Sequence, residues 1–308
     1  MAQTLLQIVQ ACVDEIGGMT RPSSVIGSTD TTVRQMLALM NREGVELSAR
    51  VSANEGWPVL RKEYRFPTVV VTGQTGTLTV DSAVITGIPS TASLVVGYGV
   101  SGTGIAANSH ILTIDSGTQV TLDYAATASG TGVALTFGKD QYSFPSDIQY
   151  FINRTGWDRT SRWELSGPTS AQDWQVLKSA VAGTGFLYRY RIMAGKIFFD
   201  PVPNVAHNMV FEYYSNAWCQ SSGGTAQTVW TADTDTPILD DYLFTLGLKW
   251  RFLRAKGLDY AQEARTYEDA IERTMSRAGT AADISMDNRG GRGRLIDYAN
   301  VDDSGFGA

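Results

Sequence analysis

The chain has 308 residues, of which 43% are hydrophobic and 18% charged, and its formal net charge is −6. This length allows one large domain or two ordinary ones with an ample core. No run of about 18 apolar residues occurs, so no transmembrane helix is predicted. The negative charge argues against a protein that grips nucleic acid over a broad basic face, although it suits a surface past which nucleic acid slides.

The N-terminus and the cysteines exclude further classes of protein. The first 18 residues are too polar for a signal peptide and lack a basic start. Cys12 and Cys219 lie far apart in the sequence and match neither a disulfide framework nor a zinc site. We therefore expect a protein of a reducing compartment.

Two amphipathic helices are predicted near the N-terminus. Apolar residues recur at helical spacing over residues 2–16, and Gly17 follows as a C-terminal stop. Asp30 is placed to cap a second helix over residues 30–53. The buried stripe predicted for this second helix consists of Val33, Leu37, Met40, Gly44, Leu47 and Val51.

Residues 67–138 have a composition of their own, without Lys or Arg and with few acids. Short strands separated by Gly, Ser and Pro turns predict a small β-sandwich or barrel. The sequence YRFP at 64–67 is echoed by YSFP at 142–145. We interpret residues 69–138 as a domain inserted between neighbouring strands of one sheet. The predicted strands lie near residues 77–80, 83–88, 94–99, 110–114, 119–123 and 133–137.

Gly97, Gly99 and Gly102 have the G-x-G-x-x-G spacing of a dinucleotide-binding site, and Asp115 follows them. In such a site the glycines open a helix whose N-terminus binds the pyrophosphate. Only residues 103–109 separate the last glycine from the next predicted strand, which is too short for a crossover helix. We predict no cofactor site, and expect the glycines to provide a bulge, tight turns and close strand packing.

The C-terminal half combines strands with a helical hairpin. A possible capping box of Thr169 and Gln172 precedes a short helix, and residues 186–201 predict a β-hairpin that turns at Ala194 and Gly195. A further strand is predicted at residues 209–218.

A long helix follows, with Thr236 or Asp235 as its cap and Pro237 at its first position. It is predicted to end at Gly257, after which residues 258–279 run back as a second helix. Residues 280–308 are polar and Gly-rich, and alone in solution they are predicted to be disordered.

Together these elements predict an α+β fold with three parts. Residues 1–68 and 139–279 form a discontinuous body, a helical bundle or hairpin with antiparallel strands. Residues 69–138 form the inserted all-β domain, sandwich or barrel-like. Residues 280–308 form an extended docking arm.

No catalytic, cofactor or metal site is predicted. His110 and His207 lie in no metal-ligand spacing, and the Walker A, G-x-S-x-G and H-E-x-x-H motifs are absent from the sequence. The acid pairs at 233/235 and 240/241 are interpreted as loop solvation and helix-start charges. We therefore predict a protein that is not an enzyme.

Two basic clusters are candidates for subunit or tail interfaces. In the first, arginines alternate with tryptophans, and both residue types suit protein hot spots as well as nucleic-acid contacts. A loop pinned by Trp packing, with Arg stacked on it, is the structural alternative. The second is a helix C-terminus whose basic face could meet an acidic neighbouring subunit. The candidates are Arg154, Trp157, Arg159, Arg162 and Trp163 in the first cluster and Lys249, Arg251 and Arg254 in the second.

Several stretches resemble the head-to-tail adaptor (connector) proteins of tailed bacteriophages, including the tail tubular protein A type. They include WPVLRKE, YSFPSDIQYFINRTGWDRT, GPTSAQDWQVLKS and DTPILDDYLFTLGLKWRFLRAKG. The resemblance covers almost all of the body in chain order but not residues 69–138, which look like a module found in phage structural proteins. It implies a non-catalytic ring, typically a dodecamer, below the portal. Such a ring extends the DNA channel, helps to retain the genome and presents a platform to tail proteins.

The resemblance also implies partners and a location. We expect a virion neck protein, assembled in the host cytoplasm, that contacts the portal, the tail nozzle or tube and its own copies but no membrane. Double-stranded DNA would pass through the lumen without sequence specificity. The resemblance does not give the task of the insert, but its near absence of charge leads us to expect that it faces outward and contacts the capsid or decorates the collar. The portal-docking residues expected in the arm are Arg289, Arg292, Arg294, Leu295, Ile296, Tyr298 and Phe306.

An adhesin or carbohydrate-binding β-module of the virion is the alternative function. In the Thr- and Gly-rich segment the aromatic platforms for a sugar would be Tyr98 and Tyr124, with Phe137.

Overall fold

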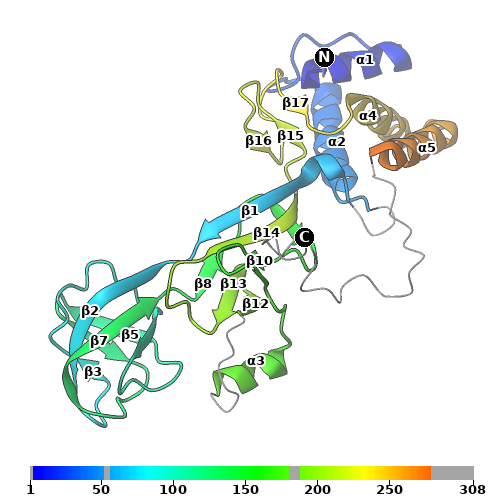
Figure 1. The fold of residues 1–308 in the computed structure, drawn as a ribbon. Coiled ribbons are helices and arrows are strands. Elements are labelled where there is room, and N and C mark those ends of the chain that lie inside the picture. Colours follow the sequence, from blue (N-terminus) through cyan, green and yellow to red (C-terminus); the bar gives the residue numbers. More distant parts are fainter. Residues whose placement is uncertain (1–2, 52–55, 180–187, 279–308) are drawn as a thin grey trace, which may run out of the picture.

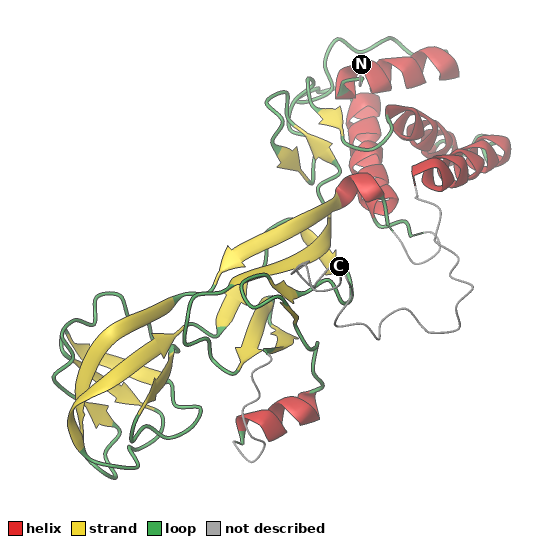
Figure 2. Cartoon of the chain, in the orientation of Figure 1, coloured by secondary structure: helices red, strands yellow, loops and turns green. Residues whose placement is uncertain are grey.

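The structure is a computed structural model that describes residues 3–51, 56–179 and 188–278. The fold is α+β as predicted, and the described chain combines five α-helices with several antiparallel sheets. Four helices gather at one end, small sheets occupy the middle, and a separate group of strands forms the other end (Figure 1). In Figure 2 the four helices lie together with a small group of strands beside them, and the fifth helix lies near the strands of the middle. None of the described sheets closes into a barrel.

The helical end uses the first two predicted helices. Gly17, at a φ of 73°, ends the first of them, and Asp30 caps the second by accepting from two backbone N–H groups of its first turn. Thr4 and Gln7 add a capping box to the first helix. The four helices are α1 (Leu5–Ile16), α2 (Thr31–Ser48), α4 (Asp241–Ala255) and α5 (Ala261–Ala278).

The buried stripe of α2 differs from the predicted one at its edges. Val51 is 52% exposed because α2 ends at Ser48, and Leu37 is only half-buried. Met36 and Glu43 are fully buried instead. The predicted stripe residues that are buried are Val33, Met40, Gly44 and Leu47.

The start of α4 lies later than predicted, and neither Thr236 nor Asp235 caps it. Residues 236 and 237 form β17 (Thr236–Pro237), which pairs with β15 (Cys219–Gln220). On its other edge β15 pairs with β16 (Ala226–Gln227). This pairing keeps the segment extended, and Asp240 caps the helix by accepting from the backbone N–H of Tyr242.

Two sheets and a short helix occupy the middle of the molecule. The first sheet has the order β1-β14-β10-β11, with β9 also paired to β14, and the second has the order β12-β13-β8. In the first sheet the strands are β1 (Arg61–Pro67), β9 (Ile148–Phe151), β10 (Trp157–Asp158), β11 (Trp163–Glu164) and β14 (Asn208–Ser215). In the second they are β8 (Gln141–Ser143), β12 (Arg189–Met193) and β13 (Lys196–Asp200). The one-turn helix η1 (Pro58–Leu60) leads into β1.

The predicted hairpin is confirmed, and the cap predicted for the short helix before it needs a correction. Ala194 and Gly195 both have positive φ in the turn between β12 and β13. The strand predicted at 209–218 is β14, which pairs in the first sheet. Helix α3 (Ala171–Lys178) is capped by Ser170 with Asp173 rather than by Thr169 with Gln172, because the Thr169 hydroxyl donates to a carbonyl of β12.

The two echoing borders lie together but not as neighbouring strands of one sheet. β1 and β8 belong to different sheets, which contradicts that expectation. The rings of Phe66 and Tyr142 are 4.8 Å apart, and the Tyr64 hydroxyl donates to the carbonyl of Ser143. The borders therefore meet through an aromatic core shared by both sheets.

Residues 70–138 form two three-stranded sheets around one apolar core. The prediction of a strand at residues 94–99 is wrong. Residues 94–98 form turns, and the next strand, β4, begins at Gly99. The sheet orders are β2-β7-β4 and β3-β6-β5. The strands are β2 (Val70–Leu78), β3 (Val84–Ile85), β4 (Gly99–Gly102), β5 (Ile111–Ser116), β6 (Gln119–Leu122) and β7 (Gly130–Gly138).

The three glycines of the G-x-G-x-x-G spacing serve turns and close packing, as predicted. Gly97 has a φ of 90° in a turn. A Cβ at Gly99 would lie 2.6 Å from a methyl group of Val202, and one at Gly102 would lie 2.7 Å from the carbonyl oxygen of Ala134. Strand β4 then pairs with β7, so the glycines open no helix.

Replacing Gly44 with alanine is expected to destabilise the protein by about 1–3 kcal/mol, although alanine is the better helix former. A Cβ at Gly44 would lie 2.2 Å from the buried indole of Trp218, so the helix or the ring must move. Urea denaturation followed by circular dichroism measures the change. Gly117→Ala is the control, because a Cβ there meets nothing within 4 Å. A stabilised Gly44→Ala protein would contradict this packing.

Candidate functional site: a buried ion network and two basic surfaces

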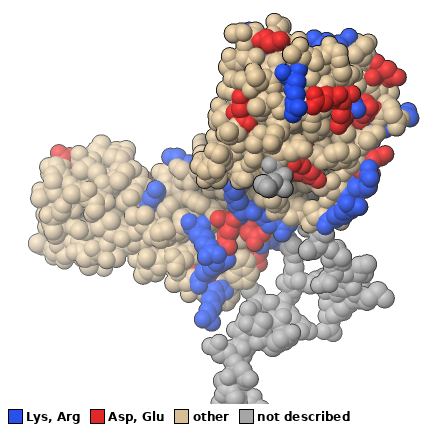
Figure 3. Space-filling model, turned by 90° about the horizontal axis from the view of Figure 1, so that it is seen from above, with Lys and Arg blue, Asp and Glu red and all other residues tan. Residues whose placement is uncertain are grey.

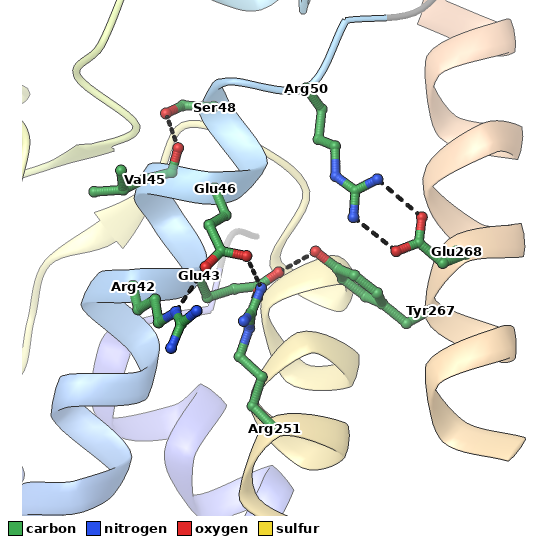
Figure 4. A network of polar contacts seen from close by, with 9 residues as sticks. All are labelled: Arg42, Glu43, Val45, Glu46, Ser48, Arg50, Arg251, Tyr267 and Glu268. Carbon is green, nitrogen blue, oxygen red and sulfur yellow. Dashed lines mark hydrogen bonds and ion pairs between the residues drawn. The ribbon is translucent and has the colours of Figure 1, made fainter. Parts of the chain in front are cut away.

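A fully buried carboxylate joins three helices at the helical end. Glu43 of α2 is 0% exposed, and it accepts from the guanidinium of Arg251 on α4 and from the hydroxyl of Tyr267 on α5 (Figure 4). Space for it comes from Gly247, where a Cβ would lie 2.3 Å from a Glu43 carboxylate oxygen. Each carboxylate oxygen thus has its own donor, as a buried charge requires.

A second tier of ion pairs surrounds this carboxylate. Glu46, one turn along α2, accepts from Arg251 at 2.8 Å and from Arg42 at 2.6 Å. Arg50 makes two hydrogen bonds to Glu268 on α5, at 2.7 and 3.0 Å. Bidentate pairs of this kind fix orientation as well as distance. The network therefore holds α2, α4 and α5 in one arrangement (Figure 4).

Burial dominates the electrostatics of the network. It raises the pKa of Glu43 above its ordinary value, although the charge of Arg251 and the hydrogen bonds oppose it. It also raises the pKa of Tyr267. Hydrogen bonding from Arg42 lowers the pKa of Glu46. Among the described residues these groups pair with one another, and Arg42 and Arg251 also line a shallow hollow at the surface, so the arrangement suits a fixed packing of the three helices.

The three candidates on α4 have different surroundings. Arg251 is 6% exposed and is engaged inside the chain. Lys249 pairs with Glu15 of α1 and Glu263 of α5, at 3.1 and 3.2 Å. Arg254 is exposed beside the ring of Tyr260. Of the three, Arg254 has the surroundings of an outward-facing contact.

Arg254 also borders a shallow hollow of about 260 Å³ between α2 and α4. Arg42 and Arg254 supply its positive charge, and Leu39 and Trp250 supply its apolar surface. A partner with an acidic and apolar segment would complement this surface.

The candidate cluster at residues 153–168 is spread around a small hairpin. Trp157 pairs with Glu164 and Trp163 with Asp158, which places the two indoles on opposite faces. Both are about two-fifths exposed, at 39% and 38%. The structure therefore does not bring them into one aromatic patch.

The arginines of this hairpin also separate. Arg154 and Arg162 both have a φ of 60° and lie exposed in turns, whereas Arg159 pairs with Glu63 of β1 at 2.8 Å. The turn tips therefore leave Arg154 and Arg162 directed toward solvent, where they are available to a partner.

A His, an Asp and a Ser meet behind this hairpin, a set that the sequence analysis missed. His207 Nδ1 lies 2.7 Å from Asp158 Oδ2 and 3.3 Å from Ser161 Oγ, and its Nε2 lies 3.1 Å from the Tyr188 hydroxyl. In a catalytic triad the serine and the aspartate contact opposite ring nitrogens. Here they share one nitrogen, so the set ties β10 to the chain around His207 and lacks triad geometry.

Three further predictions concern metal and membrane sites, a sugar-binding aromatic surface and the portal-docking arm at residues 280–308. In the described ranges no group of three His, Cys, Asp or Glu side chains could hold a metal ion, and no helix there has the length and apolarity to cross a bilayer. Phe137 is fully buried, Tyr98 is half-buried and Tyr124 is 54% exposed, so they form no shared sugar platform. All predicted arm residues, from 289 to 306, lie outside the described residues.

Comparison with protein families finds a match to the SU10 adaptor protein family over residues 113–294, more than half of the chain. The chain belongs to the SU10 adaptor protein family. This SU10 adaptor is thus a bacteriophage structural protein of the adaptor type, a virion component. The match begins within β5, so it includes part of the segment that the sequence analysis set outside the resemblance. No curated protein matches the chain.

Proposed function

We propose that this SU10 adaptor forms a homo-oligomeric ring below the portal, typically a dodecamer, in the virion neck. The ring extends the DNA channel, helps to retain the genome and offers a platform for tail attachment. The family match over residues 113–294 carries this proposal. Double-stranded DNA passes without sequence specificity, consistent with a net charge of −6. The ring assembles in the host cytoplasm. Its subunits have a structural role and catalyse no reaction.

The structural support for a ring subunit is the rigidity of its helical end. The buried pair of Glu43 and Arg251 fixes α2 against α4, and Lys249 fixes α1 and α5 to the same helix. A subunit that carries load between a head and a tail needs such fixed helices. The exposed Arg154, Arg162 and Arg254 are the contacts we assign to neighbouring subunits or to the tail.

We further propose the division into body, insert and arm. In support, the first residue pair of β2 and β7 joins Val70 to Gly138, and the N–H of Lys139 donates to the carbonyl of Val69. The chain thus enters and leaves the strand-rich end at one point, as an insertion requires. This end carries almost no charge in the view of Figure 3, and we assign it a contact with the capsid or collar through backbone and hydroxyl groups.

Mixing the full chain with purified portal protein should yield rings on the portal in negative-stain electron microscopy. A variant with glutamate at the three exposed arginines, Arg154, Arg162 and Arg254, should remain folded and form fewer rings. Arg34→Glu, which reverses a single exposed arginine on α2, is the control for charge reversal at one site and should assemble normally. A chain that stays monomeric beside intact portal, or that binds glycans instead, would contradict the proposal.

A further inference from the structure

The strand-rich end is fastened to the body by a histidine between two carboxylates. His110 precedes β5, and its Nε2 lies 3.2 Å from Asp140 Oδ2 while its Nδ1 lies 3.5 Å from Asp123 Oδ2. The backbone N–H of His110 also donates to Asp123 at 2.7 Å. Asp123 follows β6 within the strand-rich end, whereas Asp140 lies beyond the end of β7. The imidazole therefore bridges the two parts.

A second pair of charges lies against this bridge. The Asn108 side chain donates to the carbonyl of Lys178 at the end of α3, at 2.9 Å. The Lys178 ammonium lies 3.1 Å from Asp200 at the end of β13, and its charge acts on His110. Asp140 in turn acts on the buried phenol of Tyr142. Lys139 adds a second cation, since its ammonium lies 5.0 Å from the centre of the Tyr142 ring. With a neutral His110 the described junction holds two cations and three carboxylates, so a proton on His110 balances the remaining negative charge.

Close backbone packing sets the position at which this bridge forms. A Cβ at Gly138 would lie 2.2 Å from the carbonyl oxygen of Pro203, and one at Gly99 would lie 2.6 Å from a methyl group of Val202. The two glycines thus let β4 and β7 rest on the loop after β13. This contact contains no titratable group, so its strength does not change with pH, unlike the bridge beside it.

We propose that protonation of His110 controls how firmly the strand-rich end is held against the body. A protonated imidazole donates to Asp140 and Asp123 together, whereas a neutral ring can donate through one nitrogen only. At mildly acidic pH the end is fixed in one orientation. At alkaline pH the glycine contact, the Asn108 hydrogen bond and one imidazole hydrogen bond remain, and the end moves more freely about the link at residues 67–69 and 138–140.

The direction of this dependence follows from linkage. Hydrogen bonding to Asp140 raises the pKa of His110 in the docked state above its ordinary value. The docked state therefore binds the proton more tightly than the undocked one. The stabilisation of the docked state by the His110 proton is complete below the ordinary histidine pKa of about 6.5. It is lost as the pH rises through the raised pKa of His110 in the docked state.

Single-molecule energy transfer on the full chain tests this proposal. Dyes at Ser93→Cys and Gln262→Cys report the distance between the two ends, and the native Cys12 and Cys219 are buried and will not label. The native chain should give one narrow distance population at pH 6 and a broad one at pH 9. His110→Gln should be broad at both, since glutamine cannot carry the second proton.

Matched variants keep the outcomes distinct. Asp115→Asn removes an exposed carboxylate on the outer face of the same strand-rich end and should keep the native response. Asp140→Asn should behave as His110→Gln, and circular dichroism at both pH values verifies that each variant is folded. An unchanged distance population between pH 6 and pH 9 in the native chain would overturn the proposal. So would a native-like response in folded His110→Gln.

Discussion

Replacing Arg251 with alanine is expected to lower the free energy of unfolding by about 3–5 kcal/mol. The substitution leaves the fully buried carboxylate of Glu43 without its counterion, and the remaining donor on that side chain is the Tyr267 hydroxyl. An unpaired charge in the interior costs far more than a lost surface contact. Urea denaturation with linear extrapolation measures the loss.

Two controls separate the buried charge from a general effect on α4. Arg254→Ala removes the same side chain type one turn along, on the exposed face, and should change stability by less than about 0.5 kcal/mol. The triple variant Glu43→Leu, Arg251→Met and Tyr267→Phe replaces the network with apolar groups and should recover most of the loss. If the triple variant is less stable than Arg251→Ala, the carboxylate is not the source of the cost.

The sequence predicted helices well where local chemistry decides their ends. Asp30 and Gly17 act through their own side chain or backbone on adjacent residues, so their roles follow from a short window. The start of α4 does not follow from a short window of sequence. Thr236 and Pro237 have the local preference of a helix start, but pairing with β15, a strand distant in sequence, overrides it. Tertiary hydrogen bonding of this kind has no local signal.

The buried network was missed for a similar reason, although a signal was present. Glu43 lies three residues after Met40 and four before Leu47, which is on the buried stripe of α2. An acid on an apolar stripe predicts a buried partner. Which cation supplies it could not be predicted, because Arg251 lies 208 residues away in the sequence. The residues next to Arg251 in the sequence accordingly predict an exposed basic side chain.

The strand-rich end shows what glycine spacing can and cannot indicate. The short segment after Gly102 predicted no crossover helix, and in the structure β4 pairs with β7 where a dinucleotide-binding site would begin a helix. Strand placement failed at residues 94–98, where apolar residues with strand character form turns instead, and where Gly99 rather than Leu94 begins the strand. The turns are closed by local hydrogen bonds, from the N–H of Leu94 to the carbonyl of Thr91 and from the N–H of Tyr98 to the carbonyl of Val95.

Removing residues 280–308 is expected to leave the subunit folded and to abolish its binding to the portal. In the described residues the last side chains of the core come from α5, with the buried Ile271 and the partly buried Met275, and we expect the subunit to fold on these contacts. The arm carries Arg289, Arg292 and Arg294 among glycines, a composition that suits ordering on a partner. Hydrogen bonds to charged groups are worth about 1.5–3 kcal/mol each, so three such contacts correspond to at least about a thousandfold in affinity.

Surface plasmon resonance against immobilised portal measures this loss, and the arm supplies its own control. Alanine at the three arginines should weaken binding nearly as much as the truncation, with a steep dependence on salt, because arginine contacts to carboxylates are screened at the rim of an interface. Asparagine at Asp302 and Asp303 changes the same arm by two charges of the other sign and should leave binding intact. A truncated chain that binds the portal normally would move the docking surface to the body, where the exposed Arg254 beside its hollow is the next candidate.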